Sequence, residues 1–273
     1  MDALISVEPL VSPVVDTHCH MDVQYDDEHI LPSVDSAMAS ARSAGVAKVI
    51  QVGCDVSSSQ WATEVASTHP DVWAAVALHP NAAAHDPELE NSLKTIAELA
   101  ALPQVRAIGE TGLDYFRTGP DGISAQQHSF RQHIEIAKNS GKALVIHDRD
   151  AHDDVVRILL DQGAPETVVF HCFSGGVELA TICAEHGWYT SFSGTVTFKN
   201  APELREAVKV MPAELLLVET DSPFLTPAPY RGRPNASTLL PLTVRTISDT
   251  RGASEQEICE ALFVNAARVF GPF

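Results

Sequence analysis

Two histidines stand one residue apart at the end of an apolar run, in the stretch VVDTHCHMD at residues 14–22. In an extended strand the side chains at positions i and i+2 lie on the same face, so His18 and His20 should point one way and Cys19 the other. Neutral imidazole is a good ligand for Zn²⁺, Mn²⁺ and related ions. The spacing therefore indicates that His18 and His20 bind one metal ion from a rigid strand end, while Cys19 is a small core residue.

Polar residues follow other apolar runs of the chain in the same way. These residues are His79, Glu110, His147, His171, Glu219 and Asp221. A single histidine or carboxylate at a strand end is more often a hydrogen-bonded rim residue, a helix cap or part of an Asx turn. That explanation fails for a joint set of four histidines and two carboxylates, namely His18, His20, Glu110, His147, His171 and Asp221. Such a set is enough for two metal ions about 3.5–4 Å apart, which would activate a water molecule for hydrolysis.

These side chains can meet only if the runs that carry them lie side by side. Eight short apolar runs recur along the chain, at residues 13–18, 47–53, 72–80, 105–110, 143–147, 167–171, 188–194 and 214–221. Helical stretches, several with i, i+3, i+4 apolar spacing, separate them, for example 31–45, 57–70, 87–100, 124–141 and 151–163. This alternation predicts an α/β protein, a (β/α)8 TIM barrel, whose strands end on one rim that carries the active site. A doubly wound open sheet is the alternative, because alternation alone does not prove closure.

Several residues outside this set have simpler structural explanations. Ser254 followed by Glu257 predicts the N-cap and capping box of a final helix. The other seven histidines fall in helical or loop stretches, where we expect them to be solvated or to cap helices; they are His29, His69, His85, His128, His133, His152 and His186.

Composition limits the classes of protein to which the chain can belong. Its 273 residues, 45% of them hydrophobic, can bury a sizeable core, and without a linker we expect one domain over residues 1–273. No run approaches the roughly 18 apolar residues of a membrane span, and the first residues lack the basic start of a secretory signal. Five scattered cysteines indicate reduced thiols. We therefore expect a soluble cytoplasmic protein with no obligate protein partner.

Charge restricts how the chain could bind nucleic acid. The net charge is −18, which argues against a broad basic groove. It leaves room for a small local site in which bound metal supplies the positive charge.

The motifs, taken in order, resemble those of the TatD family of metal-dependent deoxyribonucleases, within the amidohydrolase-like barrels. The matching stretches span nearly the whole chain: DTHCHMD, ALHPN, AIGETGLDYFR, VIHDRDAHDD, FHCFSGG, SFSGTVTFKN, LLVETDSPFLTPAPYRGRPN and NAARVFG. The resemblance implies metal ligation by the six residues named above, with Glu110 bridging both ions, and places His79 near a substrate phosphate. Asp148 stands where the family more often has threonine and Asn81 where a second histidine is common. Asn81 weakens any claim that its loop supplies a further ligand.

The bridging group distinguishes this chain from many related hydrolases. Many binuclear amidohydrolases bridge their metals with a carbamylated lysine at the end of the fourth strand. Glu110 occupies that place here, and the nearest later lysine, Lys142, precedes the fifth run rather than ending it. We therefore expect a carboxylate bridge and no modified lysine.

The resemblance and the ligand set together suggest hydrolysis of a DNA phosphodiester. Asp221, a ligand of one ion, would also act as the general base toward the attacking water. Glu219 would either support a metal site or hold its loop. Arg231 and Arg233 would bind substrate phosphates, for which arginine is well suited, or brace the loop in which they lie.

Two aromatic residues, Tyr115 and Phe116, follow Glu110 closely in the sequence. Either could stack on a nucleobase at a strand end. Packing of both rings under the rim is the simpler explanation, and we favour it.

A narrow mouth would admit a DNA end more easily than a duplex interior. We therefore expect exonuclease action on single-stranded or frayed DNA, helped by cationic residues at the mouth: Arg117, Arg149, Lys199, Arg231 and Arg233. An amidohydrolase or esterase acting on a small molecule or aminoacyl ester is the main alternative, because the same ligands could polarise a carbonyl. A non-catalytic metal-binding scaffold is a third, which the presence of all six ligands opposes. The ligands accept Zn²⁺, Mn²⁺ or Mg²⁺, so the identity of the two divalent ions stays open.

Overall fold

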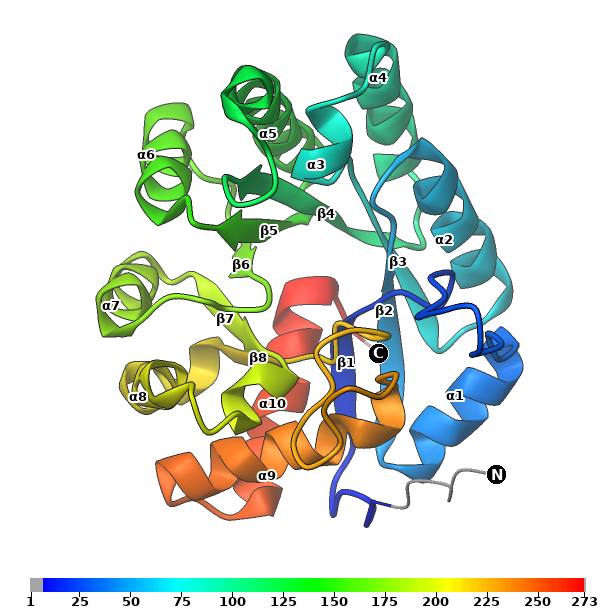
Figure 1. Ribbon diagram of the computed structural model, residues 1–273, viewed down its shortest axis with the longest axis vertical. Helices are drawn as coiled ribbons and strands as arrows, with labels where there is room; N and C mark the ends of the chain where they lie inside the picture. Colours follow the sequence, from blue (N-terminus) through cyan, green and yellow to red (C-terminus); the bar gives the residue numbers. More distant parts are fainter. Residues whose placement is uncertain (1–6, 273) are drawn as a thin grey trace.

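Eight parallel strands, paired in sequence order, form the centre of the protein in the computed structural model, which describes residues 7–272 (Figure 1). They are β1 (Val14–Cys19), β2 (Val46–Val52), β3 (Val72–Val76), β4 (Val105–Asp114), β5 (Ala143–Arg149), β6 (Val168–Phe170), β7 (Tyr189–Phe192) and β8 (Leu216–Val218). The ring closes where Cys19 forms a parallel bridge with Ser222, just after β8, and where the Asp221 amide donates to the His18 carbonyl at 2.9 Å. The predicted (β/α)8 barrel is confirmed.

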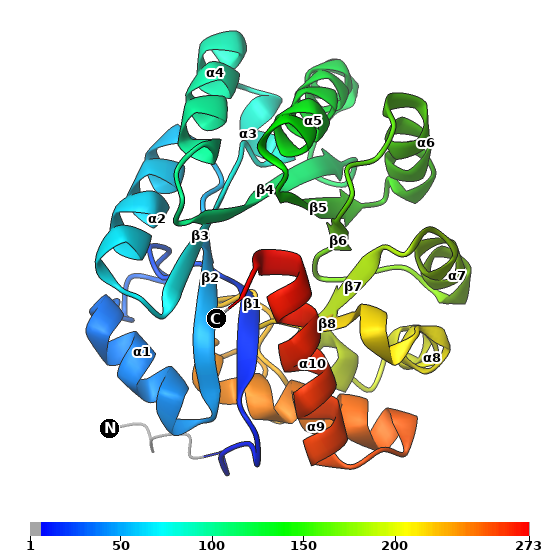
Figure 2. The same cartoon turned by 180° about the vertical axis from the view of Figure 1, so that it is seen from behind.

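Helices surround this barrel, and the last of them, α10, lies across one end of it (Figures 1 and 2). They are α1 (Val34–Ser43), α2 (Val56–Thr68), α3 (Pro80–Ala83), α4 (Leu89–Ala100), α5 (Pro120–Ser140), α6 (His152–Gln162), α7 (Val177–His186), α8 (Pro202–Val210), α9 (Leu240–Arg251) and α10 (Glu255–Phe270). The capping box predicted for the last helix is present, with Ser254 and Glu257 each bonding the other's backbone amide. Within residues 7–272, no helix combines the length and apolar character needed to cross a membrane.

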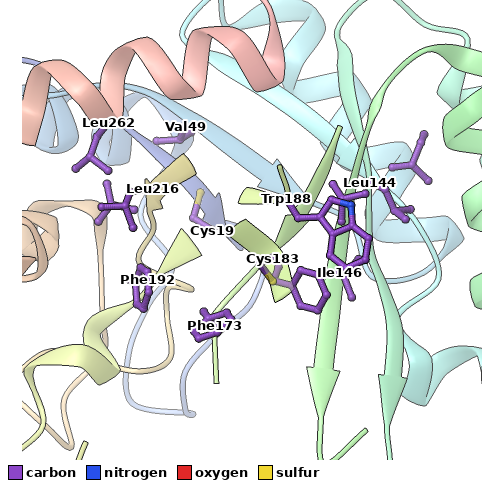
Figure 3. Packing of buried hydrophobic residues seen from close by; sticks show 14 of the residues in the cluster. Cys19, Val49, Leu144, Ile146, Phe173, Cys183, Trp188, Phe192, Leu216 and Leu262 are labelled. Atoms are coloured by element: carbon purple, nitrogen blue, oxygen red, sulfur yellow. The ribbon is translucent and has the colours of Figure 1, made fainter. Parts of the chain in front are cut away.

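Apolar side chains form two separate clusters, one on each side of the sheet. The outer cluster fills the space between strands and helices, and Figure 3 shows part of it, including Cys183, Trp188 and Leu262. Cys19 belongs to this cluster, which confirms its predicted place in the core. The inner cluster fills the barrel near the start of the strands and joins Val15 and Ile50 to residues of α10, which lies across the barrel beside β1 and β8 (Figure 2). The inner cluster thus closes one end of the barrel, and the polar residues inside the barrel lie at the other end.

The fourth strand is longer than its apolar run predicts. We expected the strand to end at Glu110, but β4 continues to Asp114 and pairs with β5 up to Arg149. Gly112 makes this extension compatible with the neighbouring strand: its φ is +139°, and a Cβ there would lie 2.1 Å from the His147 carbonyl oxygen. The polar stretch after Glu110 is therefore part of the sheet, and it brings Asp114 to the rim.

One histidine that we expected to be solvated or to cap a helix is instead buried in the core. His133 lies in α5 and is fully buried. Its Nε2 accepts a hydrogen bond from the Leu78 amide at 3.0 Å, and its Nδ1 donates to the Ser129 carbonyl at 2.7 Å. The expectation was wrong for His133, because helical spacing alone does not show which polar position of α5 faces the barrel.

The burial of His133 should make stability depend on pH. Burial lowers the pKa of this imidazole to about 4, from 6.5 when unburied. The unfolded chain therefore binds more protons than the folded one between pH 6.5 and 4, and the free energy of unfolding falls as pH falls through that window. The full loss should be about 3 kcal/mol, reached near pH 4.

Denaturant unfolding at several pH values, compared between the wild type and His133→Gln, measures this loss. Glutamine can keep one hydrogen bond and does not titrate, so the variant should be less stable at pH 7 but show a shallower decline toward pH 4. The difference between the two proteins removes the contribution of other titrating groups. Equal pH dependence in both proteins would show that His133 does not carry the effect.

Candidate metal centre

Six ligand-type side chains, carried by the ends of five strands, meet at the end of the barrel opposite α10. His18 lies within β1 and His20 directly follows this strand, Glu110 lies within β4, and His147 lies within β5. His171 directly follows β6, and Asp221 follows β8 by three residues. The structure therefore brings together all six residues that the sequence pattern selected.

The first group of these atoms surrounds one oxygen of Glu110. The Nε2 atoms of His18 and His20 are 3.2 Å apart. His18 Nε2 lies 3.4 Å from Glu110 Oε2, and His20 Nε2 lies 3.4 Å from Asp221 Oδ1. Atoms of His18, His20 and Glu110 are close enough to one another to hold one metal ion.

The second group surrounds the other oxygen of the same carboxylate. Glu110 Oε1 lies 2.5 Å from His147 Nδ1 and 2.8 Å from His171 Nε2. His79 Nε2 also approaches this oxygen, at 3.4 Å. Glu110 thus turns one oxygen to each group, which is the arrangement that a bridging carboxylate requires.

The second ring nitrogen of three of these histidines faces a fixed acceptor. His20 Nδ1 donates to the Val52 carbonyl at 3.1 Å, because a carbonyl can only accept. His171 Nδ1 lies 3.0 Å from Glu219 Oε1, and His147 Nε2 lies 3.2 Å from Asp114 Oδ2. Such contacts fix the tautomer and orient the ring, leaving the opposite nitrogen free to ligate.

Asp114 is a member of the site that sequence reasoning missed. It is buried and, besides His147, it accepts hydrogen bonds from Asn81 Nδ2 at 3.2 Å and from the amides of Phe116 and Arg117. Burial would raise the pKa of Asp114, but its hydrogen bonds to His147 and to the backbone hold it below the usual value. A carboxylate four residues after Glu110 was a signal, but it is informative only once β4 is known to extend that far.

Glu219 has a defined contact within the site. It is fully buried, and its Oε1 accepts from His171 Nδ1 and, at 2.7 Å, from the Cys172 amide. We predicted that Glu219 would either support a metal site or hold its loop. These contacts favour the first role, because Glu219 orients the candidate metal ligand His171. Lys142 lies elsewhere: its Nζ donates to the carbonyls of Ala100 and Leu102, at the start of β5.

The electrostatics of the centre favour positive charge. Burial disfavours the charged form of His171, but the carboxylates of Glu110 and Glu219 outweigh it and raise the pKa of His171 well above its usual range. The pKa of His20 is raised as well, in spite of burial, by its neighbours Cys54 and Asp221. The carboxylates thus stabilise positive charge between them, which divalent cations would also supply. Imidazole and carboxylate donors around a buried anionic centre fit such ions.

The backbone at Asp221 is held in an uncommon conformation. Its φ of +55° lies in the left-handed region, which non-glycine residues seldom adopt. The neighbouring Thr220 is fixed on both sides: its amide and hydroxyl donate to buried Asp16 at 2.9 and 2.7 Å, and its carbonyl accepts from Asn235 at 2.9 Å. These contacts hold the carboxylate of Asp221 toward His20.

His79 lies beside the candidate metal centre, and a hydrogen bond from the backbone determines which of its two ring nitrogens carries the proton. It is the N-cap of α3, and its Nδ1 accepts a hydrogen bond from the Asn81 amide at 3.1 Å. In the neutral ring the proton is therefore on Nε2, which faces Glu110 at 3.4 Å. A donor in this position suits an anionic oxygen better than a metal ion.

The two arginines predicted to bind substrate lie on the segment after β8. Arg231 and Arg233 are both exposed. The Arg231 guanidinium carbon lies 4.0 Å from the centroid of the Phe198 ring, in the segment after β7. Both arginines are therefore on the same rim as the metal centre.

Comparison with known proteins gives a consistent family. The family model described as TatD related DNase matches residues 15–271. A relative described as an uncharacterized metal-dependent hydrolase TatD, from Mycobacterium tuberculosis, is 42% identical over 262 residues, which are 94% of this chain and 98% of the relative. The hydrolase YabD of Bacillus subtilis, described in similar words, is 38% identical over 93% of this chain and 98% of its own. Among solved structures, the TatD homologue YJJV of Escherichia coli superposes with a TM-score of 0.86 at 27% identity, covering 94% of this chain and 97% of the homologue.

Proposed function

Since this chain belongs to the TatD family of related DNases, we propose that it is a metal-dependent hydrolase that cleaves phosphodiester bonds at DNA ends. The observation that carries this proposal is the position of Glu110, whose two oxygens face separate groups of nitrogen and oxygen donors. His18, His20, Glu110 and Asp221 would hold one divalent ion. Glu110, His147 and His171 would hold the other.

Asp221 is the residue best placed to accept a proton from the attacking water. Its side chain is 15% exposed, so solvent reaches it, while its partners are buried. Burial would raise the pKa of Asp221, but its hydrogen bond to His20 and the nearby imidazoles lower it, which keeps the carboxylate ionised near neutral pH. Divalent ions bound here would supply Lewis acidity that neutralises charge developing on the phosphoryl oxygens.

His79 would bind the substrate phosphate rather than a metal. Its Nε2 proton points into the centre beside Glu110 and can be donated to a non-bridging phosphate oxygen. Arg231 and Arg233 would contact phosphates further from the reacting bond.

Positive charge near the metal centre would allow this acidic chain to bind DNA, which is a polyanion. Arg117, Lys199, Arg231 and Arg233 are exposed on segments that follow β4, β7 and β8, and Arg149 ends β5. These cations lie on segments of the same rim as the candidate metal centre, although the net charge of the chain is −18. Binding confined to the mouth would contact few phosphates and would favour an accessible strand end.

A time course on an end-labelled single strand, its duplex form and a closed circle tests this function. We expect stepwise shortening of the single strand, slower action on the duplex through fraying, and no nicking of the circle. With two or three phosphates contacted, the slope of log affinity against log salt should be about −1.4 to −2.1, at roughly −0.7 per phosphate for single strands.

Two outcomes would contradict the proposal. Rapid nicking of the closed circle, or a salt slope several times steeper, would show an open groove with many phosphate contacts. Faster turnover of carbonyl substrates than of any oligonucleotide, in a panel of amides, small esters and aminoacyl esters, would favour the amidohydrolase or esterase alternative.

A further inference from the structure

Among residues 7–272, exposed aromatic side chains lie at one end of the barrel. Within residues 7–272 the large aromatic residues with exposed side chains are Tyr25, Phe116 and Phe224. Each lies on a segment that follows a strand at the metal-centre rim: Tyr25 after β1, Phe116 after β4 and Phe224 after β8. Phe116 is the most exposed of them, at 63%. Our expectation that it packs under the rim was wrong, whereas its neighbour Tyr115 is partly buried, as expected.

The backbone that presents Phe116 is rigid and joined to the metal centre. The Phe116 amide donates to Asp114 Oδ1 at 3.1 Å, and the other oxygen of this carboxylate contacts His147 Nε2 at 3.2 Å. The Tyr115 amide donates to the Arg149 carbonyl at 2.9 Å, and the Tyr115 hydroxyl donates to Asp154 at 2.7 Å. One carboxylate thus links the backbone amide of Phe116 to the imidazole of His147, so the residue is anchored at the rim of the candidate metal centre.

Arg149 covers one face of the Phe116 ring. Its guanidinium carbon lies 4.0 Å from the ring centroid, which is a cation–π contact. Because the ring remains largely exposed despite this cover, its free surface is the opposite face and the edges. Within residues 7–272 the guanidinium of Arg149 forms no ion pair with a carboxylate, so its N–H groups are available to an anionic ligand.

We propose that Phe116 and Arg149 form a nucleobase site, in which the base of the nucleotide next to the cleaved phosphate stacks on the free face of Phe116. This inference rests on the proposed phosphodiesterase function. An aromatic face binds any base, so the site would give affinity without sequence preference. Arg149 would hold the ring in place from behind and pair with the phosphate of the same nucleotide.

The ligand chemistry follows from what surrounds the ring. An exposed apolar ring on a fixed backbone, with an unpaired cation against it, matches a planar group that carries a phosphate. A simple aliphatic amide or ester offers neither a ring to stack on Phe116 nor a phosphate to pair with Arg149. The position would also favour a strand end, as proposed above, because a base must leave the duplex stack to reach Phe116.

A fluorescent base analogue tests the site directly. The probes are single-stranded trinucleotides with phosphorothioate linkages that resist cleavage, carrying 2-aminopurine at the 5′ or the 3′ end, and matched trinucleotides that are abasic at the same end. With the metal-loaded wild type, one end should show quenched fluorescence on binding. Phe116→Ala should weaken binding of that probe by about 5- to 150-fold, the usual range for loss of one stacked base. Phe116→Trp should retain it, and binding of the abasic probe should not change.

Steady-state kinetics on unmodified oligonucleotides show whether the nucleobase site or the proposed phosphodiesterase function is wrong, if either is. Phe116→Ala should raise KM and leave kcat nearly unchanged, and Leu160→Ala, at an exposed residue of α6, should change neither. Equal binding of base-containing and abasic probes in wild type and Phe116→Ala would overturn the nucleobase site, even if the wild type cleaves DNA. If the wild type binds the base-containing probe more tightly than the abasic probe but cleaves no oligonucleotide, the nucleobase site would stand and the phosphodiesterase function would be overturned. Absence of probe binding would overturn the site.

Discussion

Replacement of Asp221 by asparagine should lower kcat by a factor of about 10²–10⁴, the contribution usual for a positioned general base. Asparagine keeps the size of the side chain and one oxygen, but its amide is a very poor proton acceptor. The neighbours of Asp221 hold its pKa below the usual value, with burial opposing them, so the wild-type carboxylate is ionised at neutral pH. The fold should survive, because the left-handed backbone at this position also suits asparagine.

Metal content must be measured together with rate in this variant. Asp221 Oδ1 lies 3.4 Å from His20 Nε2 within the first donor group, so loss of its charge should also weaken one metal site. Elemental analysis and steady-state kinetics at saturating metal separate the two effects. Asp249→Asn, which removes an exposed carboxylate from α9, is the matched control and should retain full activity. Turnover near that of the wild type in fully loaded Asp221→Asn would exclude Asp221 as the base.

Removal of both histidines of the first group should lower metal content from about two ions per chain to about one and abolish turnover. In His18→Ala/His20→Ala only two carboxylates remain in that group, too few for a stable site. The second group, in which Glu110 Oε1 meets His147 and His171, is left intact. Elemental analysis after metal loading and dialysis gives the stoichiometry without depending on activity.

Two further variants complete this experiment. His147→Gln/His171→Gln should remove the other ion and leave the first, while His29→Ala/His128→Ala removes two exposed histidines and should keep both ions. Circular dichroism shows whether each variant is folded. A wild type that binds less than one ion per chain, or unchanged stoichiometry in His18→Ala/His20→Ala, would contradict the binuclear assignment.

The six-residue set could be predicted from sequence because two local rules were sufficient. Alternation along a strand places His18 and His20 on one face with Cys19 on the other. Parallel strands joined by helices all end on the same rim, so polar residues at several strand ends must converge wherever they lie in the chain. For the same reason the eight-stranded barrel was predictable, although the strand limits were not: β3 ends at Val76, before His79, and β8 contains only Leu216–Val218.

Contacts between residues far apart in the sequence were decided only by the tertiary structure. Asp114 and His147 are 33 residues apart, and they meet because β4 runs past Glu110 and approaches β5 closely at Gly112. His171 and Glu219, 48 residues apart, meet because β6 and β8 lie on the same side of the closed barrel.

Burial of individual polar and aromatic residues also depended on the tertiary structure. His133 is a polar position of an amphipathic helix, and only the packing of α5 against the segment after β3 shows that it binds the Leu78 amide in the core. Tyr115 and Phe116 are adjacent and similar in type, yet one ring turns inward to Asp154 and the other outward to Arg149. The sequence by itself thus determined which residue types end the strands, and hence the chemistry available at the rim. The closure of the barrel determined which of them touch, because register between strands and the direction of each side chain after a strand end depend on neighbours distant in the chain.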